Sequence, residues 1–368
     1  MKPTGQLHDL GQSIWLDNIT RGLLTHGTLQ RYIDEFSVTG LTSNPTIFDK
    51  AIQEGGLYDA VIQRLTDEGK SGEALFFELA IEDLTRAADL FRPVHDSTGG
   101  IDGWVSLEVS PLLAGDTAGT ISAAARLHHA AQRPNLFIKI PGTEQGIPAI
   151  EASIFAGVPV NVTLLFSREQ YIDAAQAYLR GIERRIAAGL DPRVGSVASI
   201  FVSRWDVAVK DKVPPPLRNR LGIAIAERAY QAYRNLLASP RWQHVAAAGA
   251  RPQRLLWAST GTKDPAAADT LYVESLAAPD TINTVPDKTL QAFADHGELR
   301  GVLPIDGGDA EDVLAQFARA GVDDVALAAQ LQREGAQAFD RSWKDLIGRI
   351  DGKSTAPEKG NPTREGHS

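Results

Sequence analysis

Three side chains in this sequence are of types that could form and use a covalent bond to a carbonyl carbon. Lys139 lies in the apolar run LFIKIPGT, Glu108 in GWVSLEVSP and Asp17 in SIWLDNI. Burial disfavours the charged form of an amine, and a neutral lysine can attack a ketone to form a Schiff base. Two carboxylates near that lysine could transfer protons as general acids and bases.

The same three residues have a second interpretation. Lysine is seldom fully buried unless it is paired, so Lys139 and Glu108 could form a structural ion pair, and Asp17 could also be an ion-pair partner. The position of Lys139 in an apolar run leaves both interpretations open.

Short apolar runs hold these residues and alternate with long helical patterns. The runs are SIWLDNI, VTGLTSNP, GWVSLEVSP, LFIKIPGT, PVNVTLLFS, GSVASIFVS, RLLWAST and LYVESLAA. The stretches between most of them, such as REQYIDAAQAYLRGIERRIAAG, carry good helix formers with apolar residues three and four positions apart. This alternation predicts the α/β class with a parallel sheet, and eight strands favour a closed (β/α)8 TIM barrel over an open sheet.

The chain is longer than a minimal barrel requires. Residues 49–98 carry several helical patterns between the second and third strands, and residues 309–350 read as C-terminal helices on the outside of the barrel. We therefore expect residues 1–350 to form a single catalytic domain. Residues 351–368 contain almost no apolar side chains and are expected to form a disordered tail.

Side-chain alternation along the strands predicts where polar groups gather. Neighbouring residues of a strand point to opposite faces, and the inward face of a barrel forms the active site near the C-terminal rim. Polar groups converging from six strands are costly to bury, which favours one polar pocket, although the asparagines, threonine and serine could simply hydrogen-bond inside the barrel. The residues assigned to this face include Asp17, Thr42, Asn44, Ser106, Glu108, Lys139, Asn161, Thr163, Ser199 and Phe201.

Composition excludes several classes of function. The net charge of −9 disfavours a nucleic-acid-binding protein, and the absence of cysteine excludes disulfides and cysteine catalysis. No apolar run approaches the roughly 20 residues of a membrane helix, and the N-terminus has no apolar signal segment. We expect a soluble cytoplasmic protein that binds neither membranes nor nucleic acid, and either a monomer or a homodimer.

The motifs of these strands resemble those of the transaldolases. They are GLTSNPTIF, VSLEVSP, FIKIPGTEQGIPAIE, NVTLLFS, ASIFVSRWD and WASTGTKDP. The likeness covers essentially all eight strands and is strongest to the longer bacterial branch of the family. The most specific feature is IKIPGT followed by NVTLLFS with one helix between them.

The resemblance implies a role for individual residues. Lys139 corresponds to the Schiff-base lysine of the family, and Asp17, Glu108 and Thr163 to its other catalytic residues. Lys263 lies in the segment where shorter members carry a phosphate-binding arginine. The residues implied to bind substrate are Asn44, Asn161, Ser199, Phe201, Arg204 and Lys263.

The resemblance also implies a reaction. A dihydroxyacetone unit would pass from sedoheptulose 7-phosphate or fructose 6-phosphate to glyceraldehyde 3-phosphate or erythrose 4-phosphate, in the non-oxidative pentose phosphate pathway. Small sugar phosphates would be its substrates, and no metal or organic cofactor would be needed because the iminium withdraws electrons. The alternatives are a class I aldolase that uses free dihydroxyacetone and a non-catalytic barrel that binds sugar phosphates.

Overall fold

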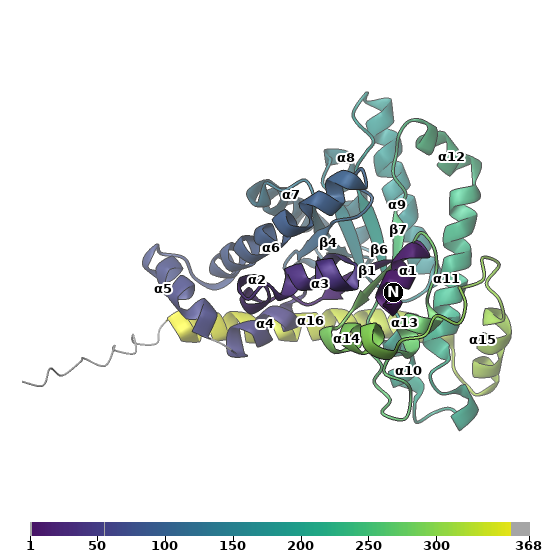
Figure 1. The fold of residues 1–368 in the computed structure, drawn as a ribbon. Helices are drawn as coiled ribbons and strands as arrows, with labels where there is room; N and C mark the ends of the chain where they lie inside the picture. Colours follow the sequence, from purple (N-terminus) through teal and green to yellow (C-terminus); the bar gives the residue numbers. More distant parts are fainter. Residues whose placement is uncertain (1, 55, 355–368) are drawn as a thin grey trace, which may run out of the picture.

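Eight parallel strands close into a barrel in the computed structural model, which describes residues 2–54 and 56–354. Each strand pairs with its neighbours in chain order, and β8 pairs with β1. The strands are β1 Ser13–Asp17, β2 Val38–Thr42, β3 Val105–Glu108, β4 Leu136–Pro141, β5 Val160–Leu165, β6 Ser196–Phe201, β7 Arg254–Ala258 and β8 Ile282–Val285. This topology confirms the predicted (β/α)8 barrel (Figure 1).

Helices surround the barrel and several of them begin at a capping side chain. Thr20, Asp116, Ser167 and Ser239 each accept a hydrogen bond from a backbone N–H in the first turn of the helix that follows. The helices are α1 Pro3–Asp9, α2 Arg21–Thr25, α3 Thr28–Phe36, α4 Pro45–Glu54, α5 Asp59–Asp67, α6 Gly72–Ser97, α7 Thr117–Ala131, α8 Gly146–Ala156, α9 Arg168–Ala187, α10 Ser203–Val209, α11 Leu221–Ala238, α12 Pro240–Ala247, α13 Leu271–Ser275, α14 Asp287–His296, α15 Ala310–Arg319 and α16 Asp324–Ser354, with short 3-10 turns at Gly56–Tyr58, Pro111–Leu113 and Pro215–Leu217. None of these helices is both long and apolar enough to cross a membrane.

The predicted additions to the barrel are present. Helices α4, α5 and α6 lie between β2 and β3, and α15 and α16 follow the last strand. The long α16 packs against α4, α5 and α6 and also reaches β5, so it passes from the added helices to the barrel itself (Figure 1). This course brings the C-terminal part of the chain to the strands that carry the predicted site.

The prediction of the eighth strand was wrong. The run LYVESLAA forms the short helix α13 and the turn after it, and the eighth strand is the next segment, Ile282–Val285. The strand residues Asn283 and Thr284 are almost completely buried. Asn283 accepts a hydrogen bond from the Thr260 hydroxyl at 2.8 Å. A strand of four residues with two polar side chains looks like a loop in the sequence, because the hydrogen bonds that these side chains make come only from tertiary contacts.

The predicted boundary of the C-terminal tail was also wrong. Helix α16 continues through residues 351–354, where the tail was expected to begin. Residues 355–368, which make up the rest of the predicted tail, lie outside the described residues.

Buried apolar side chains form two layers, as the strand alternation predicted. One layer lies between the barrel and its helices and includes Leu107, Ile138 and Val162. The other includes Trp15 and Phe137 inside the barrel and continues to side chains of α15 and α16. The aliphatic faces of the strands therefore pack against the helices, and the side chains of the opposite faces fill the barrel.

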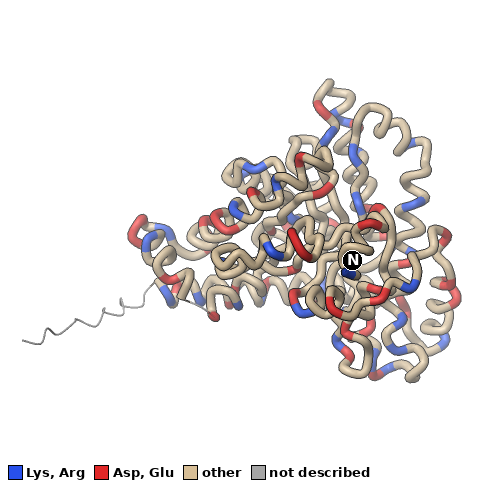
Figure 2. Tube along the Cα trace, in the orientation of Figure 1, with Lys and Arg blue, Asp and Glu red and all other residues tan. Residues whose placement is uncertain are grey.

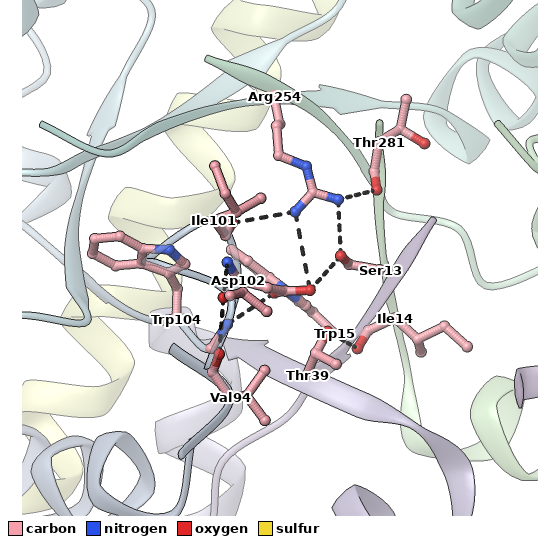
Figure 3. Close-up of polar contacts among 12 residues, drawn as sticks. Ser13, Ile14, Trp15, Thr39, Val94, Ile101, Asp102, Trp104, Arg254 and Thr281 are labelled. Carbon is pink, nitrogen blue, oxygen red and sulfur yellow. Dashed lines mark hydrogen bonds and ion pairs between the residues drawn. The ribbon is translucent and has the colours of Figure 1, made fainter. Parts of the chain in front are cut away.

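A polar cluster closes the barrel at the end where the strands begin (Figure 3). Asp102, just before β3, accepts hydrogen bonds from the Ser13 hydroxyl and from the Trp15 indole N–H, the latter at 2.8 Å. Arg254, the first residue of β7, donates to Ser13 at 2.8 Å and to the Thr281 carbonyl at 2.7 Å. Its guanidinium lies 4.0 Å from the Asp102 carboxylate. These charges join β1, β7 and the start of β3 far from the rim where the chemistry was predicted.

Replacing Asp102 with alanine is expected to destabilise the fold strongly. The substitution leaves the Trp15 N–H, the Ser13 hydroxyl and the nearby Arg254 guanidinium without their carboxylate. Breaking a buried charged pair on one side costs about 3–5 kcal/mol, and we expect a decrease of this size in the free energy of unfolding, measured by urea denaturation. The control is Asp89→Ala, which removes an exposed carboxylate paired with Arg133 and should cost less than about 1 kcal/mol. Equal losses for the two variants would contradict this assignment.

Candidate active site

Lys139 is buried in the centre of the barrel near the C-terminal ends of the strands. It is 5% exposed, and its Nζ donates a hydrogen bond to the Ser43 carbonyl at 2.9 Å. The same Nζ lies 3.3 Å from Oε2 of Glu108. The two residues are register partners on β4 and β3, so the strand pairing itself sets this contact. The ion pair allowed by the sequence is therefore present, and it lies beside an open cavity.

Burial changes the acidity of both carboxylates near this lysine. Desolvation raises the pKa of Glu108, and the neighbouring Lys139 charge opposes the rise. Desolvation also raises the pKa of Asp17, against the opposing effects of Lys139, of a Thr42 hydrogen bond and of the Lys263 charge. A carboxyl group whose pKa is raised exchanges protons more readily near neutral pH. Both groups are thus suited to general acid and base work.

Asn161 is held in one orientation by its neighbours. Its amide nitrogen donates to the Ser106 hydroxyl at 3.1 Å, and its carbonyl oxygen accepts from the Ser199 hydroxyl at 2.7 Å. Thr163, two residues further along β5, is completely buried, and its hydroxyl has no hydrogen-bond partner within the described part of the chain. Such a hydroxyl is available to a substrate group or a water molecule.

The first two strands contribute a second polar group of side chains. The Thr42 hydroxyl donates to Oδ1 of Asp17 at 2.9 Å and lies 2.6 Å from the Thr284 hydroxyl. Asn44 follows β2, and its side-chain oxygen accepts from the Ile47 N–H, which caps the start of α4. The cap uses the oxygen of the Asn44 amide and leaves its NH2 group for the cavity.

A cavity of about 130 Å³ lies at the C-terminal rim and joins these groups. Glu108 and Asn161 do not line it, but they contact Lys139 and Ser199, which do. The structure therefore brings together every residue that the sequence assigned to the site. The predicted residues that line the cavity are Asp17, Asn44, Lys139, Thr163, Ser199, Phe201, Arg204 and Lys263.

Two cations lie at the mouth of this cavity. Arg204 is on α10, immediately after β6, and its guanidinium carbon is 5.1 Å from the centre of the Phe201 ring and 5.9 Å from that of Phe339. Burial lowers the pKa of Arg204, and no carboxylate within residues 2–54 and 56–354 forms an ion pair with it. Lys263 follows β7, is exposed and has its charge close enough to Asp17 to lower the pKa of that carboxyl. Both cations line the cavity, where an anionic group of a ligand can contact them.

Sequence reasoning missed several residues of the cavity wall. Thr284 was missed because β8 was not identified. Ser259 is recognisable only from the structure, where it has a φ of 56° and hydrogen-bonds to Ser203 at 2.9 Å. Phe339 lies on α16, far along the chain, and only its helical apolar spacing marks it as a buried residue. No group of three or more histidine or acidic side chains in the described residues could hold a metal ion.

Comparison with known proteins agrees with the geometry of the cavity. Residues 14–350 match the family model described as Transaldolase/Fructose-6-phosphate aldolase. A transaldolase of Arthrobacter sp. (strain FB24) is 44% identical over 366 residues, which cover 97% of this chain and 99% of the relative. A transaldolase of Thiobacillus denitrificans is 45% identical over 358 residues, covering 95% of this chain and 100% of the relative. The chain therefore belongs to the transaldolase/fructose-6-phosphate aldolase family.

Proposed function

We propose that this chain is a transaldolase, which transfers a dihydroxyacetone unit from a ketose phosphate to an aldose phosphate. The observation that carries the proposal is the buried Lys139 amine, which lines a polar cavity together with Asp17 and contacts Glu108. The names of the relatives support the same activity. The proposed donors are sedoheptulose 7-phosphate and fructose 6-phosphate, and the acceptors are glyceraldehyde 3-phosphate and erythrose 4-phosphate.

The first half of the proposed reaction forms the Schiff base. The Lys139 Nζ, as a neutral amine, adds to the ketone carbon and gives a carbinolamine. Glu108 gives a proton to the departing hydroxyl, which leaves as water, and an iminium remains. The free hydroxyl of Thr163 supports this step, because it could hold the water that carries protons between Glu108 and the substrate.

The second half breaks a carbon–carbon bond. Asp17 removes the proton from the hydroxyl on the far carbon of the bond that breaks, and that carbon becomes the aldehyde of the departing aldose phosphate. The electron pair of the broken bond moves into the iminium, so a dihydroxyacetone enamine stays on Lys139. The raised pKa of Asp17 supports its role as the base that accepts this proton.

The enamine then attacks the aldehyde of a second aldose phosphate, and the steps run in reverse to release the new ketose phosphate. Asn44, Asn161 and Ser199 would hold the hydroxyls of the dihydroxyacetone unit. The fixed orientation of Asn161 supports this role, since a preorganised amide loses little freedom when it binds. The iminium is the electron sink of this chemistry, so the proposal includes no cofactor.

Borohydride trapping with fructose 6-phosphate tests the proposal directly. Reduction should leave a stable adduct, and peptide mass spectrometry should place it on Lys139. A coupled assay with erythrose 4-phosphate then separates the proposal from its alternatives. Release of free dihydroxyacetone at a rate comparable to transfer would favour a class I aldolase. The absence of any adduct would favour a non-catalytic barrel that binds sugar phosphates.

Arg204 is proposed to bind the substrate phosphate together with Lys263, and Phe201 is proposed as a further substrate-binding residue. Arginine can hold a phosphate with two parallel hydrogen bonds, and no carboxylate in the described part of the chain competes for this guanidinium. We expect Arg204→Ala to raise the KM for fructose 6-phosphate by roughly 10- to 100-fold with a smaller change in kcat, as measured by steady-state kinetics. The matched control is Arg193→Ala, which removes an exposed arginine just before the opposite end of β6. An unchanged KM in Arg204→Ala would refute the phosphate role.

The wider setting of the enzyme follows from the same proposal. We propose that it acts in the cytoplasm in the non-oxidative pentose phosphate pathway, as a monomer or homodimer whose barrel and added helices form one catalytic domain. Small sugar phosphates are its proposed partners. The proposal includes no binding to membranes or to nucleic acids. Acidic and basic positions are interspersed over the fold in Figure 2, and no broad basic face is visible in that view. The net charge of −9 agrees with this distribution.

A further inference from the structure

The C-terminal helix α16 is hydrogen-bonded to the strands that carry the candidate catalytic residues. The side-chain amide of Gln332 donates to the Gly142 carbonyl at 2.9 Å and to the Leu164 carbonyl at 3.0 Å. Gly142 directly follows β4, and Leu164 lies in β5 at a register shift, with a φ of 60°. A left-handed residue there turns the strand locally, and Gln332 bonds to its carbonyl. Helix α16 therefore has a fixed position relative to Lys139 and Thr163.

The next turn of α16 lies against Arg204. A Cβ atom on Gly335 would lie 2.9 Å from a methyl carbon of Leu164 and 3.2 Å from Nη1 of Arg204. Both separations are shorter than ordinary contacts, so a side chain at this position would push the guanidinium or the leucine aside. The absence of a side chain at Gly335 allows the Arg204 guanidinium to lie close to the helix backbone.

One further turn along α16 brings Phe339 to the same guanidinium. Phe339 is 7% exposed and lines the catalytic cavity. Together with Phe201 it places two aromatic rings within 6 Å of the Arg204 carbon. Aromatic rings attract a guanidinium without using its N–H groups, so these donors stay available to an anion. A carboxylate partner would have occupied the same donors.

We propose that Gly335 and Phe339 of α16 are positioning residues for the phosphate subsite, and that they act through Arg204. In this proposal the C-terminal helix selects phosphorylated sugars, because it holds the guanidinium at the mouth of the cavity. The inference rests on the proposed transaldolase function. Phe339 also packs in the inner apolar layer. A purely structural role would predict lower stability without a selective effect on phosphorylated donors.

The test compares substrates with and without a phosphate. We expect Phe339→Leu, which keeps apolar volume but loses the ring, to raise the KM for fructose 6-phosphate roughly three- to tenfold with kcat largely retained. We expect the same direction of change for Gly335→Ala. The kcat/KM for unphosphorylated fructose should fall much less than that for fructose 6-phosphate in both variants, and Phe339→Tyr should keep the low KM because it retains a ring.

A double-mutant cycle with Arg204→Ala decides whether the two residues act through the arginine. In that background, Phe339→Leu should no longer change the KM. The control on the same helix is Trp343→Phe, which alters packing against Phe76 and Phe77 and should leave the KM unchanged. The inference is overturned if Phe339→Leu and Gly335→Ala bind fructose 6-phosphate as the unaltered protein does, or if the effect of Phe339→Leu persists without Arg204. An unaltered protein without transferase activity would instead overturn the proposed function.

Discussion

Replacing Lys139 with methionine is expected to abolish transfer, with kcat/KM reduced by on the order of 10⁴-fold or more. Methionine retains much of the apolar length of lysine but has no nucleophilic amine. The fold should survive, because burial already raises the pKa of Glu108 and that carboxyl can take up a proton when its cation is removed. A coupled transfer assay with fructose 6-phosphate and erythrose 4-phosphate measures the loss.

Borohydride trapping gives the same variant a second readout. The unaltered protein should carry a reduced adduct on Lys139, and the methionine variant should carry none. The matched control is Lys210→Met, which changes an exposed lysine away from the cavity and should retain both activity and adduct. An adduct of normal yield in Lys139→Met would assign the Schiff base to another lysine and would leave the Lys139–Glu108 contact as a structural ion pair.

The alternation of side chains along strands predicted most of the candidate site. It placed Lys139 and Glu108 on the same inward face, and the structure makes them register partners with Nζ and Oε2 3.3 Å apart. The prediction worked because successive side chains of a strand point to opposite faces of the sheet. Paired residues of neighbouring parallel strands then point to the same face. The catalytic roles of these residues stay predictions, because the geometry supports them but only a measurement of the reaction tests them.

Other parts of the site could not be read from the sequence, for identifiable physical reasons. Thr284 lies in a short strand, and its hydroxyl contacts the Thr42 hydroxyl while its backbone carbonyl accepts from the Thr260 hydroxyl, contacts that exist only after the barrel has closed. Phe339 reaches the cavity from a helix that follows the last strand. Its helical spacing shows that it is buried, but only the packing of α16 shows that it lies beside Arg204.

Lys263 and Arg254 are two cations close to β7 in the sequence, and the structure shows which of them lies at the cavity. The sequence suggested a cation after the seventh strand, and the structure places Lys263 on the cavity wall, where it is exposed. Arg254 is the arginine of β7 itself, but it is the first residue of that strand and belongs to the polar cluster at the opposite end of the barrel. Position along the strand therefore separates a candidate phosphate ligand from a structural cation.

Asp17→Asn is expected to separate Schiff-base formation from carbon–carbon cleavage. Asparagine has nearly the same shape as aspartate, and its oxygen can still accept the hydrogen bond from Thr42. It cannot remove the substrate hydroxyl proton, so we expect kcat to fall by roughly 10²- to 10⁴-fold. Lys139 should still react, and borohydride should trap the intact six-carbon sugar phosphate instead of a three-carbon unit.

The pH dependence of the unaltered protein provides an independent check on Asp17. A general base works only as the carboxylate, and burial raises the pKa of Asp17 above its ordinary value of 3.8. Activity should therefore decline on the acidic side at a higher pH than an exposed aspartate would give. Glu108→Gln serves as the contrasting variant, because it should slow formation of the adduct itself. A three-carbon adduct formed by Asp17→Asn at the normal rate would show that another group removes the proton, and Asp17 would then be an electrostatic partner of Lys139.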